Sequence, residues 1–406
     1  MGTKTLIRLF IALAIIGGAA AIFHFAGPGS GISEVDSSTT KKKVFEEFPI
    51  NNVAKIVVRD KESELALVKG ETSWEVSQRD GYPANAEPIV SLLRDIWDLN
   101  IGQPITIGRS QYGRLDLIHP DEANETDTGA TILTFQDAEG KDLASLWLGK
   151  VFERSENRPS PIGGMATTDA GRYVKTGTSN SVFLVGETFD SVKMDPAEWI
   201  DKTFFKVDKI KTIEIKSEES SEDWKLVRTE ASGDFSFAKE IEGEELDQSK
   251  VSSMKSAFSN AQIEDVFTGD AKKENTPDKT TFLISTFDGF QYEIHVGEKN
   301  DLNELPLSLK VAGEFQEKRK AGEDESEEDK KKLDEAFAKD LEASKTKLAE
   351  LKELEGHVFK VRSYIVDSIT KKRSELLAEK EEGADAAPGS GEEIAPGVSL
   401  PGIPNP

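Results

Sequence analysis

The chain has 406 residues, with 75 acidic and 51 basic side chains, a formal net charge of −24 and no cysteine. The acidic excess argues against nucleic acid as the main partner and against docking on an anionic membrane surface, because both attract basic residues. Without cysteine there are no disulfides, thiolate metal sites or thiol nucleophiles. The length allows two domains or more.

The N-terminal segment predicts a membrane anchor. Two basic residues precede an apolar run from Leu9 to Ala26, and about 18 apolar residues are near the lower limit for spanning a bilayer. Basic residues before the run place the rest of the chain outside the cytoplasm. A cleaved signal peptide, with small residues at 19–21, is the alternative. We expect a single-pass protein of the inner membrane, with an anchor over residues 1–27 and a flexible tether over residues 28–44.

Short strands and one helix are predicted after the tether. Alternating β-branched and aromatic residues predict strands over residues 53–60, 64–70 and 72–78. Asn85 as a cap, followed by an apolar stripe, predicts a helix over residues 83–100. The stretches "TILTFQDAEG" (131–140) and "LASLWLGK" (143–150) then predict two strands joined by an Asp-x-x-Gly turn.

The same order of elements recurs from residue 209. The stretch "TFLISTFDGFQYEIHVGEKN" again predicts strand, turn and strand, with Gly297 where Gly149 stands in the first copy. We interpret both glycines as strand ends where a side chain would obstruct the next turn. An offset of about 150 residues is too long for a solenoid unit and indicates a duplicated domain. The expected fold class is α+β, with a transmembrane helix followed by two tandem β-rich α+β repeats over residues 45–208 and 209–380.

The second copy carries a long insertion over residues 316–355. Its later part lacks Gly and Pro, and its apolar residues have heptad-like spacing, which predicts a long helix. The helix is expected either to lie back on its own domain or to form an arm that packs on a partner or a second copy; partial disorder is a third interpretation. Residues 381–406 predict a disordered acidic tail. The candidate partner-binding residues are Phe337, Leu341, Leu348 and Leu351.

No group of residues predicts a catalytic or metal site. The chain lacks a nucleophile elbow, a P-loop and a dinucleotide-binding glycine motif. Its histidines share no metal-ligand spacing. The acidic run at 324–329 lacks the turn glycine of a calcium loop. We therefore expect no enzymatic activity, no cofactor and no metal. The four histidines are His24, His119, His295 and His357.

Several motifs of the first copy occur in the order found in a known bacterial family. They are "SWEVSQRDGYPANAEPIVSLLRDIWDLN", "QYGRLDLIHP", "LWLGK" and "GRYVKTGTSNSVFLVGE", and together they resemble the domain of unknown function 4340 family. The resemblance covers roughly residues 45–315 and 356–380. It implies a membrane-anchored extracytoplasmic protein linked to gliding-motility-type ABC transporters, and it carries over no catalytic residue. The family's Tyr-Gly-Leu-x-x-Pro signature is altered here to Tyr112, Gly113, Arg114, Leu115 and Pro120.

Three functions are compatible with these features. We expect a non-catalytic, membrane-anchored accessory or scaffold protein with protein partners in the envelope, an auxiliary component of an ABC-type transporter or gliding-type complex. The alternative is an extracytoplasmic ligand-binding module with its site between the two repeats. A hydrolase is the third hypothesis, but it needs a nucleophile, a base and an orienting group in one cleft, and the sequence offers no such trio.

Overall fold

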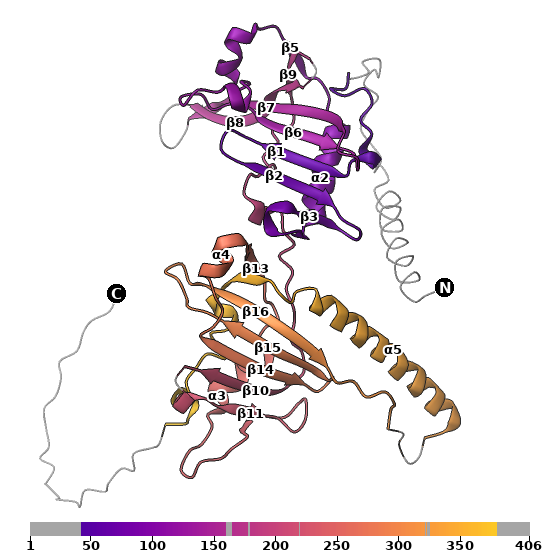
Figure 1. Cartoon of the computed structure of the whole chain (residues 1–406), viewed down its shortest axis with the longest axis vertical. Coiled ribbons are helices and arrows are strands. Elements are labelled where there is room, and N and C mark those ends of the chain that lie inside the picture. The colour runs from indigo at the N-terminus through magenta and orange to yellow at the C-terminus, as the bar shows by residue number, and fades with distance from the viewer. Residues whose placement is uncertain are drawn as a thin grey trace, which may run out of the picture.

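Two antiparallel sheets, one from each half of the chain, make up most of the structure, a computed structural model (Figure 1). It describes residues 42–159, 165–177, 179–218, 220–320, 322 and 325–379. The predicted anchor, almost all of the tether and the acidic tail lie outside these residues.

No helix within the described residues is both long and apolar enough to cross a bilayer. This finding corrects two expectations, the transmembrane helix and the single-pass location in the inner membrane, and neither is used below.

The first sheet has nine strands in the order β4-β3-β2-β1-β6-β7-β8-β9-β5. Helix α2 (Ala86–Trp97) packs against one face, begins at the predicted cap Asn85 and buries its apolar stripe. Short 3-10 turns are η1 (Ile50–Asn52), η2 (Ser77–Arg79), η3 (Arg109–Leu115), η4 (Pro120–Glu122) and η5 (Pro196–Glu198). The strands are β1 (Lys55–Arg59), β2 (Glu64–Lys69), β3 (Trp74–Val76), β4 (Tyr82–Pro83), β5 (Gln103–Ile105), β6 (Thr131–Gln136), β7 (Asp142–Pro159), β8 (Met165–Thr176) and β9 (Val182–Val185).

The second sheet has eight strands in the order β12-β11-β10-β14-β15-β16-β17-β13. Its strands are β10 (Ile210–Ser217), β11 (Lys225–Val227), β12 (Ser236–Phe237), β13 (Ile263–Phe267), β14 (Thr280–Thr286), β15 (Phe290–Val296), β16 (Glu304–Gly313) and β17 (Val358–Arg362). The helices are α3 (Gln248–Val251), α4 (Gly269–Glu274) and α5 (Glu327–Lys352), and the 3-10 turns are η6 (Ser220–Glu222), η7 (Ser252–Ser256), η8 (Ser363–Ile365) and η9 (Arg373–Leu376).

Both sheets follow one topology. When the strands are compared in their order across the sheet, β3-β2-β1-β6-β7-β8-β9-β5 corresponds one to one to β12-β11-β10-β14-β15-β16-β17-β13. Only the edge strand β4 has no counterpart in the second sheet. Isolated bridges also recur: Lys43–Asn100 corresponds to Thr203–Gln262, and Ala84–Ile200 corresponds to Leu246–Leu377. We call the two units the first and second repeat. Their boundaries at 45–208 and 209–380 stay a prediction.

The predicted α+β class is wrong, because the described chain is mostly β with few helices. The clearest difference lies in the second repeat. Where the first has a helix of 12 residues, the second has one of 4 residues followed by a 3-10 turn. Serine hydroxyls at 252 and 256 donate to the carbonyls of residues 249 and 253. Such local bonds compete with a regular helix.

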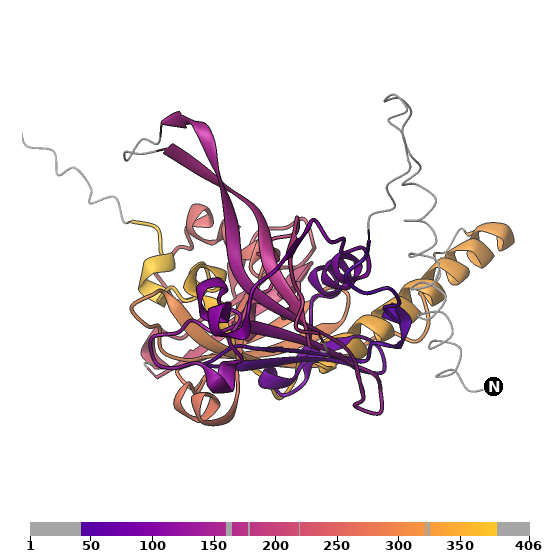
Figure 2. The same cartoon turned by 90° about the horizontal axis from the view of Figure 1, so that it is seen from above.

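The interpretation of Gly149 as a strand end is also wrong. Strand β7 continues past it to Pro159, and β7 and β8 form a hairpin that projects from the sheet (Figure 2). A Cβ at Gly149 would overlap the carbonyl oxygen of Leu115, and one at Gly297 would overlap that of Thr276. Gly297, by contrast, directly follows the end of β15 at Val296, as expected. In both repeats the glycine allows a loop to approach closely.

Candidate functional site

The outer face of each sheet, opposite the face that packs into the main core, differs most between the repeats. In the first repeat the connection between β5 and β6, residues 106–130, covers this face; we call it the cap. Its Tyr112 and Leu117 are buried in a small separate core, against which Trp147 packs. The connection between β13 and β14, residues 268–279, is shorter, so the second outer face lacks this cover.

The motif that resembles the family signature, from Tyr112 to Pro120, lies in the cap and helps to hold it in place. The Tyr112 hydroxyl donates to the carbonyl oxygen of Asn180 at 2.9 Å. Beneath the cap, Lys175 lies opposite Trp147 on the neighbouring strand, with its Nζ 3.8 Å from the ring centroid. The ring of His119 contacts the same tryptophan, with 5.1 Å between centroids. Burial, helped by the charge of Arg109, lowers the pKa of Lys175. The signature therefore builds a closed surface.

The equivalent position of the second repeat is open and polar. Strand pairing places Thr281, His295 and Ser308 where the first repeat has Ile132, Trp147 and Lys175. The Thr281 hydroxyl lies 3.0 Å from Nδ1 of His295, and Nε2 of His295 lies 2.8 Å from a Glu293 oxygen. This hydroxyl–imidazole–carboxylate chain uses the residue types of a nucleophile relay, which the sequence pattern alone did not reveal.

A groove of about 550 Å³ lies beside this chain on the outer face of the second sheet. Its floor comes from β10, β14, β15 and β16, and Lys352 and Glu355 at the end of α5 form one wall. The wall is fixed to the sheet because Glu355 Oε1 accepts from the backbone N–H of Val311 at 2.8 Å. The residues that line the groove are Thr212, Glu214, Lys225, Leu283, Ile284, Ser285, Gln291, Tyr292, Glu293, Lys310, Val311, Ala312, Lys352 and Glu355.

Acidic and basic side chains pair along the groove. Lys225 donates to Glu214 at 2.8 Å, and this hydrogen bond is the main cause of the lowered pKa of Glu214. Burial pushes the pKa of Glu293 up, but hydrogen bonds from His295 and Lys310 outweigh it and hold the pKa below its ordinary value. Both carboxylates are therefore ionised at neutral pH, and the groove offers both signs of charge within a chain that is acidic overall.

Helix α5 carries all four predicted partner-binding residues, and the structure separates them into two groups. Leu351 is buried and Leu348 packs against the core near Phe315, so the last turns belong to the second repeat. Phe337 and Leu341 are half-buried on the part of the helix that extends beyond the sheet (Figures 1 and 2). Sequence reasoning missed Leu333, which is 44% exposed on the same projecting part. A role in partner binding stays a prediction.

The helix itself follows its sequence signals. It begins after Ser326, whose hydroxyl accepts from the backbone N–H of Asp329 at 3.1 Å, three acidic residues occupy its first turn and a lysine its last. This arrangement complements the helix dipole. Arg319, in the segment before the helix, donates to Asp334 at 3.0 Å, so that segment runs back along the arm.

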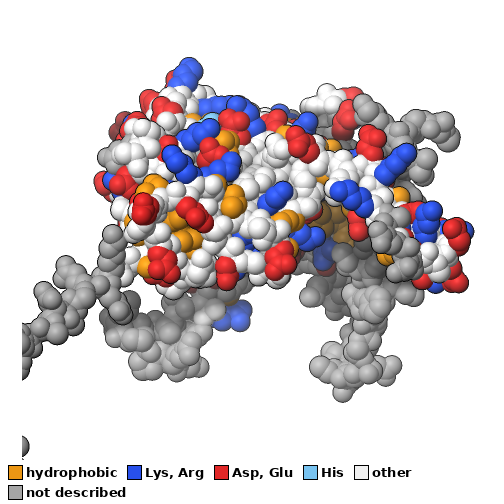
Figure 3. Space-filling model, turned by 90° about the horizontal axis from the view of Figure 1, so that it is seen from below, with side chains coloured by type: hydrophobic (Ala, Val, Ile, Leu, Met, Phe, Trp, Pro, Cys, Tyr) orange, Lys and Arg blue, Asp and Glu red, His pale blue; other side chains and the backbone are white. Residues whose placement is uncertain are grey.

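Charges of both signs are interspersed on the lower face of the molecule, and small apolar areas lie between them (Figure 3). The net charge of −24 is therefore not gathered into one acidic patch on that face. Within the described part of the chain, His, Asp and Glu form no group of three that could hold a metal ion.

One comparison with known proteins gave a match. The model of a family described as a domain of unknown function (DUF4340) matches residues 161–280. This stretch runs from the end of the first repeat into the second and supports the family resemblance there; it is shorter than the coverage expected from the motifs. No curated protein and no solved structure is detectably similar to the chain.

Proposed function

We propose that this protein is a non-catalytic accessory or scaffold protein that binds a protein partner through its second repeat. The observation that supports this most is an asymmetry within the duplication. The second repeat lacks the cap, so its outer face is open, and it gains α5, whose C-terminal end walls the groove on that face. Changes at loops on a constant scaffold are how related folds acquire different binding functions.

Two surfaces are available to the partner. The groove offers paired charges around Leu283, which lies half-buried in its floor. The projecting part of α5 offers Leu333, Phe337 and Leu341 at spacings of four residues, which lie along one side of a helix. A polar groove gives specificity through charge complementarity, whereas apolar residues of the arm give contact area. We infer that one partner contacts both surfaces.

The resemblance to the DUF4340 family favours a more specific partner. Members of that family are associated with ABC-type transporters, so a transporter subunit is the partner that we propose to test first. This step rests on the resemblance, whereas the docking surfaces rest on the geometry of the second repeat.

The test is an affinity pull-down from detergent extracts of the source cells, read by mass spectrometry for ABC-type ATPase and permease subunits. Leu333→Glu and Lys310→Glu alter the arm and the groove, respectively. Leu302→Glu is the matched control, because Leu302 is 67% exposed in the same repeat but does not line the groove. We expect transporter subunits with the unaltered protein and the control, and at least a tenfold loss with the other two variants.

Two outcomes would contradict the proposal. Failure of every sample to retain a transporter subunit would remove the proposed partner. Equal retention by all variants would show that binding does not use the arm or the groove.

A small polar ligand in the groove is the second candidate. The hydroxyl–imidazole–carboxylate chain of Thr281, His295 and Glu293 favours it, because convergent polar groups beside a cavity are typical of ligand sites. The same three residue types could also act in catalysis, and an activated-ester hydrolysis assay tests this. Hydrolysis by the unaltered protein that is lost in His295→Gln but kept in His119→Gln would contradict the non-catalytic proposal. We expect no difference among the three proteins.

A further inference from the structure

We infer that the contact between the two repeats is an acid-sensitive hinge, which opens when His357 takes up a proton. We call this contact the seam; its residues are Arg79 and Tyr82 of the first repeat and Asp265, His357 and Phe359 of the second. The inference concerns the relation of the repeats and is independent of the partner proposed above.

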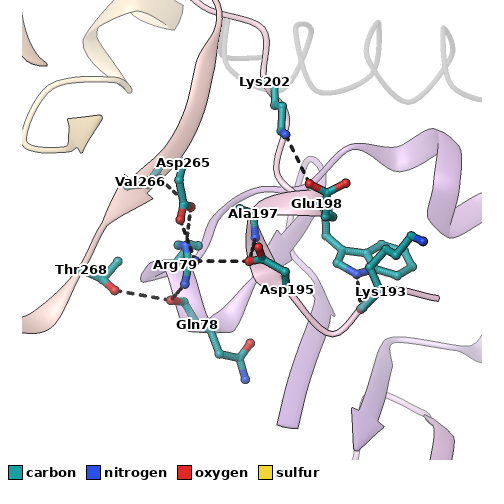
Figure 4. Close-up of polar contacts among 11 residues, drawn as sticks. Gln78, Arg79, Lys193, Asp195, Ala197, Glu198, Lys202, Asp265, Val266 and Thr268 are labelled. Carbon is teal, nitrogen blue, oxygen red and sulfur yellow. Dashed lines mark hydrogen bonds and ion pairs between the residues drawn. The ribbon is translucent and has the colours of Figure 1, made fainter. Parts of the chain in front are cut away.

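One ion pair locks the polar side of the seam (Figure 4). Nε and Nη2 of Arg79 donate to the two carboxylate oxygens of Asp265 at 2.6 and 2.8 Å, and both side chains are only about one-sixth exposed, at 16% and 15%. The pairing of β13 with β17 is irregular between Ile263 and Asp265. Such an irregularity re-aims a side chain, and here it directs the carboxylate at the arginine. Two-point pairing fixes orientation as well as distance.

Aromatic rings form the apolar side of the seam. The ring of Tyr82, which is 3% exposed, lies 5.3 Å from the ring of His357 and 6.0 Å from that of Phe359. Phe204, from the connection between the repeats, lies 4.9 Å from Phe359. The contact therefore includes an imidazole in a mainly apolar cluster, where a charged group loses hydration.

His357 is the group in the seam whose charge changes near neutral pH. It is half-buried, and the charged groups that act on it are Lys272 of α4 and Asp80 after η2. Burial lowers the pKa of His357, Lys272 lowers it further and Asp80 opposes them. Burial also raises the pKa of Tyr82, so its hydroxyl is neutral. The closed seam therefore holds neutral imidazole.

The direction of the pH effect follows from proton binding. Opening the seam hydrates His357 and removes Asp80, whereas Lys272 stays beside it through its bond to the Gly356 carbonyl. Because burial is the largest cause of the shift, the pKa of His357 rises on opening toward its ordinary value of about 6.5. The open state then binds more protons than the closed state as the pH falls below that value, so acid favours opening. Above about pH 6.5 both states hold neutral imidazole and the closed seam keeps its full stability.

The backbone segment that could act as the hinge between the two repeats is short. The bridge between Ala84 and Ile200 is the last that ties the chain to the first repeat, and the bridge between Thr203 and Gln262 is the first to the second. Only Asp201 and Lys202 lie between them, and the Lys202 ammonium contacts Glu198 at 3.8 Å on the surface (Figure 4). Hinges of this kind absorb a rotation in a few residues.

The absence of native cysteine gives a direct test. Ser110→Cys and Ser232→Cys place one exposed label on each repeat of the full chain, and energy transfer between two dyes is followed from pH 8 to pH 5. We expect a reversible fall in transfer as the pH drops through the region just below 6.5, with unchanged far-ultraviolet circular dichroism. His357→Gln should abolish this transition, whereas His295→Gln, on the outer face, should retain it.

A second variant keeps the test decisive should His357→Gln fail to fold. Asp80→Asn removes the first-repeat carboxylate that favours protonated His357 in the closed seam, so the transition should move to higher pH. Arg79→Ala removes the lock and should move it to higher pH. Energy transfer that is independent of pH, or a transition that Asp80→Asn leaves unshifted, would overturn the hinge.

Discussion

The two repeats keep one strand order but use their outer faces differently. In the first, the cap turns the face into a small core in which Lys175 lies on Trp147. In the second, Ser308 and His295 occupy the same positions, and the outer face there has no cap over it. Strand order is fixed by the buried faces, which both repeats share. The outer face is free to change with the loops that cover it.

The largest expected effect tests what the repeats have in common. Gly149→Val and Gly297→Val each place a side chain against the carbonyl of a loop residue, and we expect each to lower the free energy of unfolding by about 2–3 kcal/mol. Gly186→Ala is the control, because a Cβ there meets open space. Urea denaturation measures all three. If either valine variant were as stable as the control, the glycine would not be needed for loop approach in that repeat.

Next in size is the division of α5 into a packed end and a projecting arm. Leu351→Ala should cost about 2–3 kcal/mol, because Leu351 is 6% exposed and its removal leaves a cavity. Leu333→Ala should change the free energy of unfolding by less than about 0.5 kcal/mol. Thermal unfolding compares the two. Equal losses would show that the whole helix belongs to the fold and would remove the arm.

A smaller effect distinguishes the capped face from the open face by pH. Burial lowers the pKa of Lys175 in the folded protein, so the unfolded chain binds this proton more tightly, up to its ordinary pKa of about 10.4. The stability of the unaltered protein should therefore rise relative to Lys175→Met as pH is raised from 8 toward 10. Denaturation at both pH values measures the difference. A constant difference would indicate that the cap leaves Lys175 hydrated.

The smallest effect belongs to the open groove. Glu293 is held below its ordinary pKa, so its contribution is present above about pH 4.3 and is lost as pH falls through the folded value. Because its side chain is 41% exposed, Glu293→Gln should cost no more than about 0.5 kcal/mol at pH 7. The variant and the unaltered protein should converge at pH 3. A larger loss at pH 7 would mean that the groove holds the fold together.

Sequence reasoning predicted features that depend on local signals. Asn85 caps α2 as expected, a long helix forms in the insertion as expected, and each repeat has the expected strand pair around its turn. The fold class was missed because a serine-rich segment breaks the second helix. The apolar spacing of that segment predicts a helix, but it does not show that serine hydroxyls compete for the backbone carbonyls. The seam could not be predicted, since Arg79 and Asp265 lie 186 residues apart. The groove draws its lining from separate strands and α5, and no motif joins them.

The position of α5 has a consequence for the order of folding. In the first repeat β8 returns to β9 across residues 177–181, whereas in the second β16 returns to β17 across residues 314–357. Closing the longer connection costs about 2 kcal/mol more in chain entropy, unless α5 forms early and brings its two ends together as a rigid strut. The first repeat, made first and closed by the shorter connection, would then be the template on which the second assembles during synthesis.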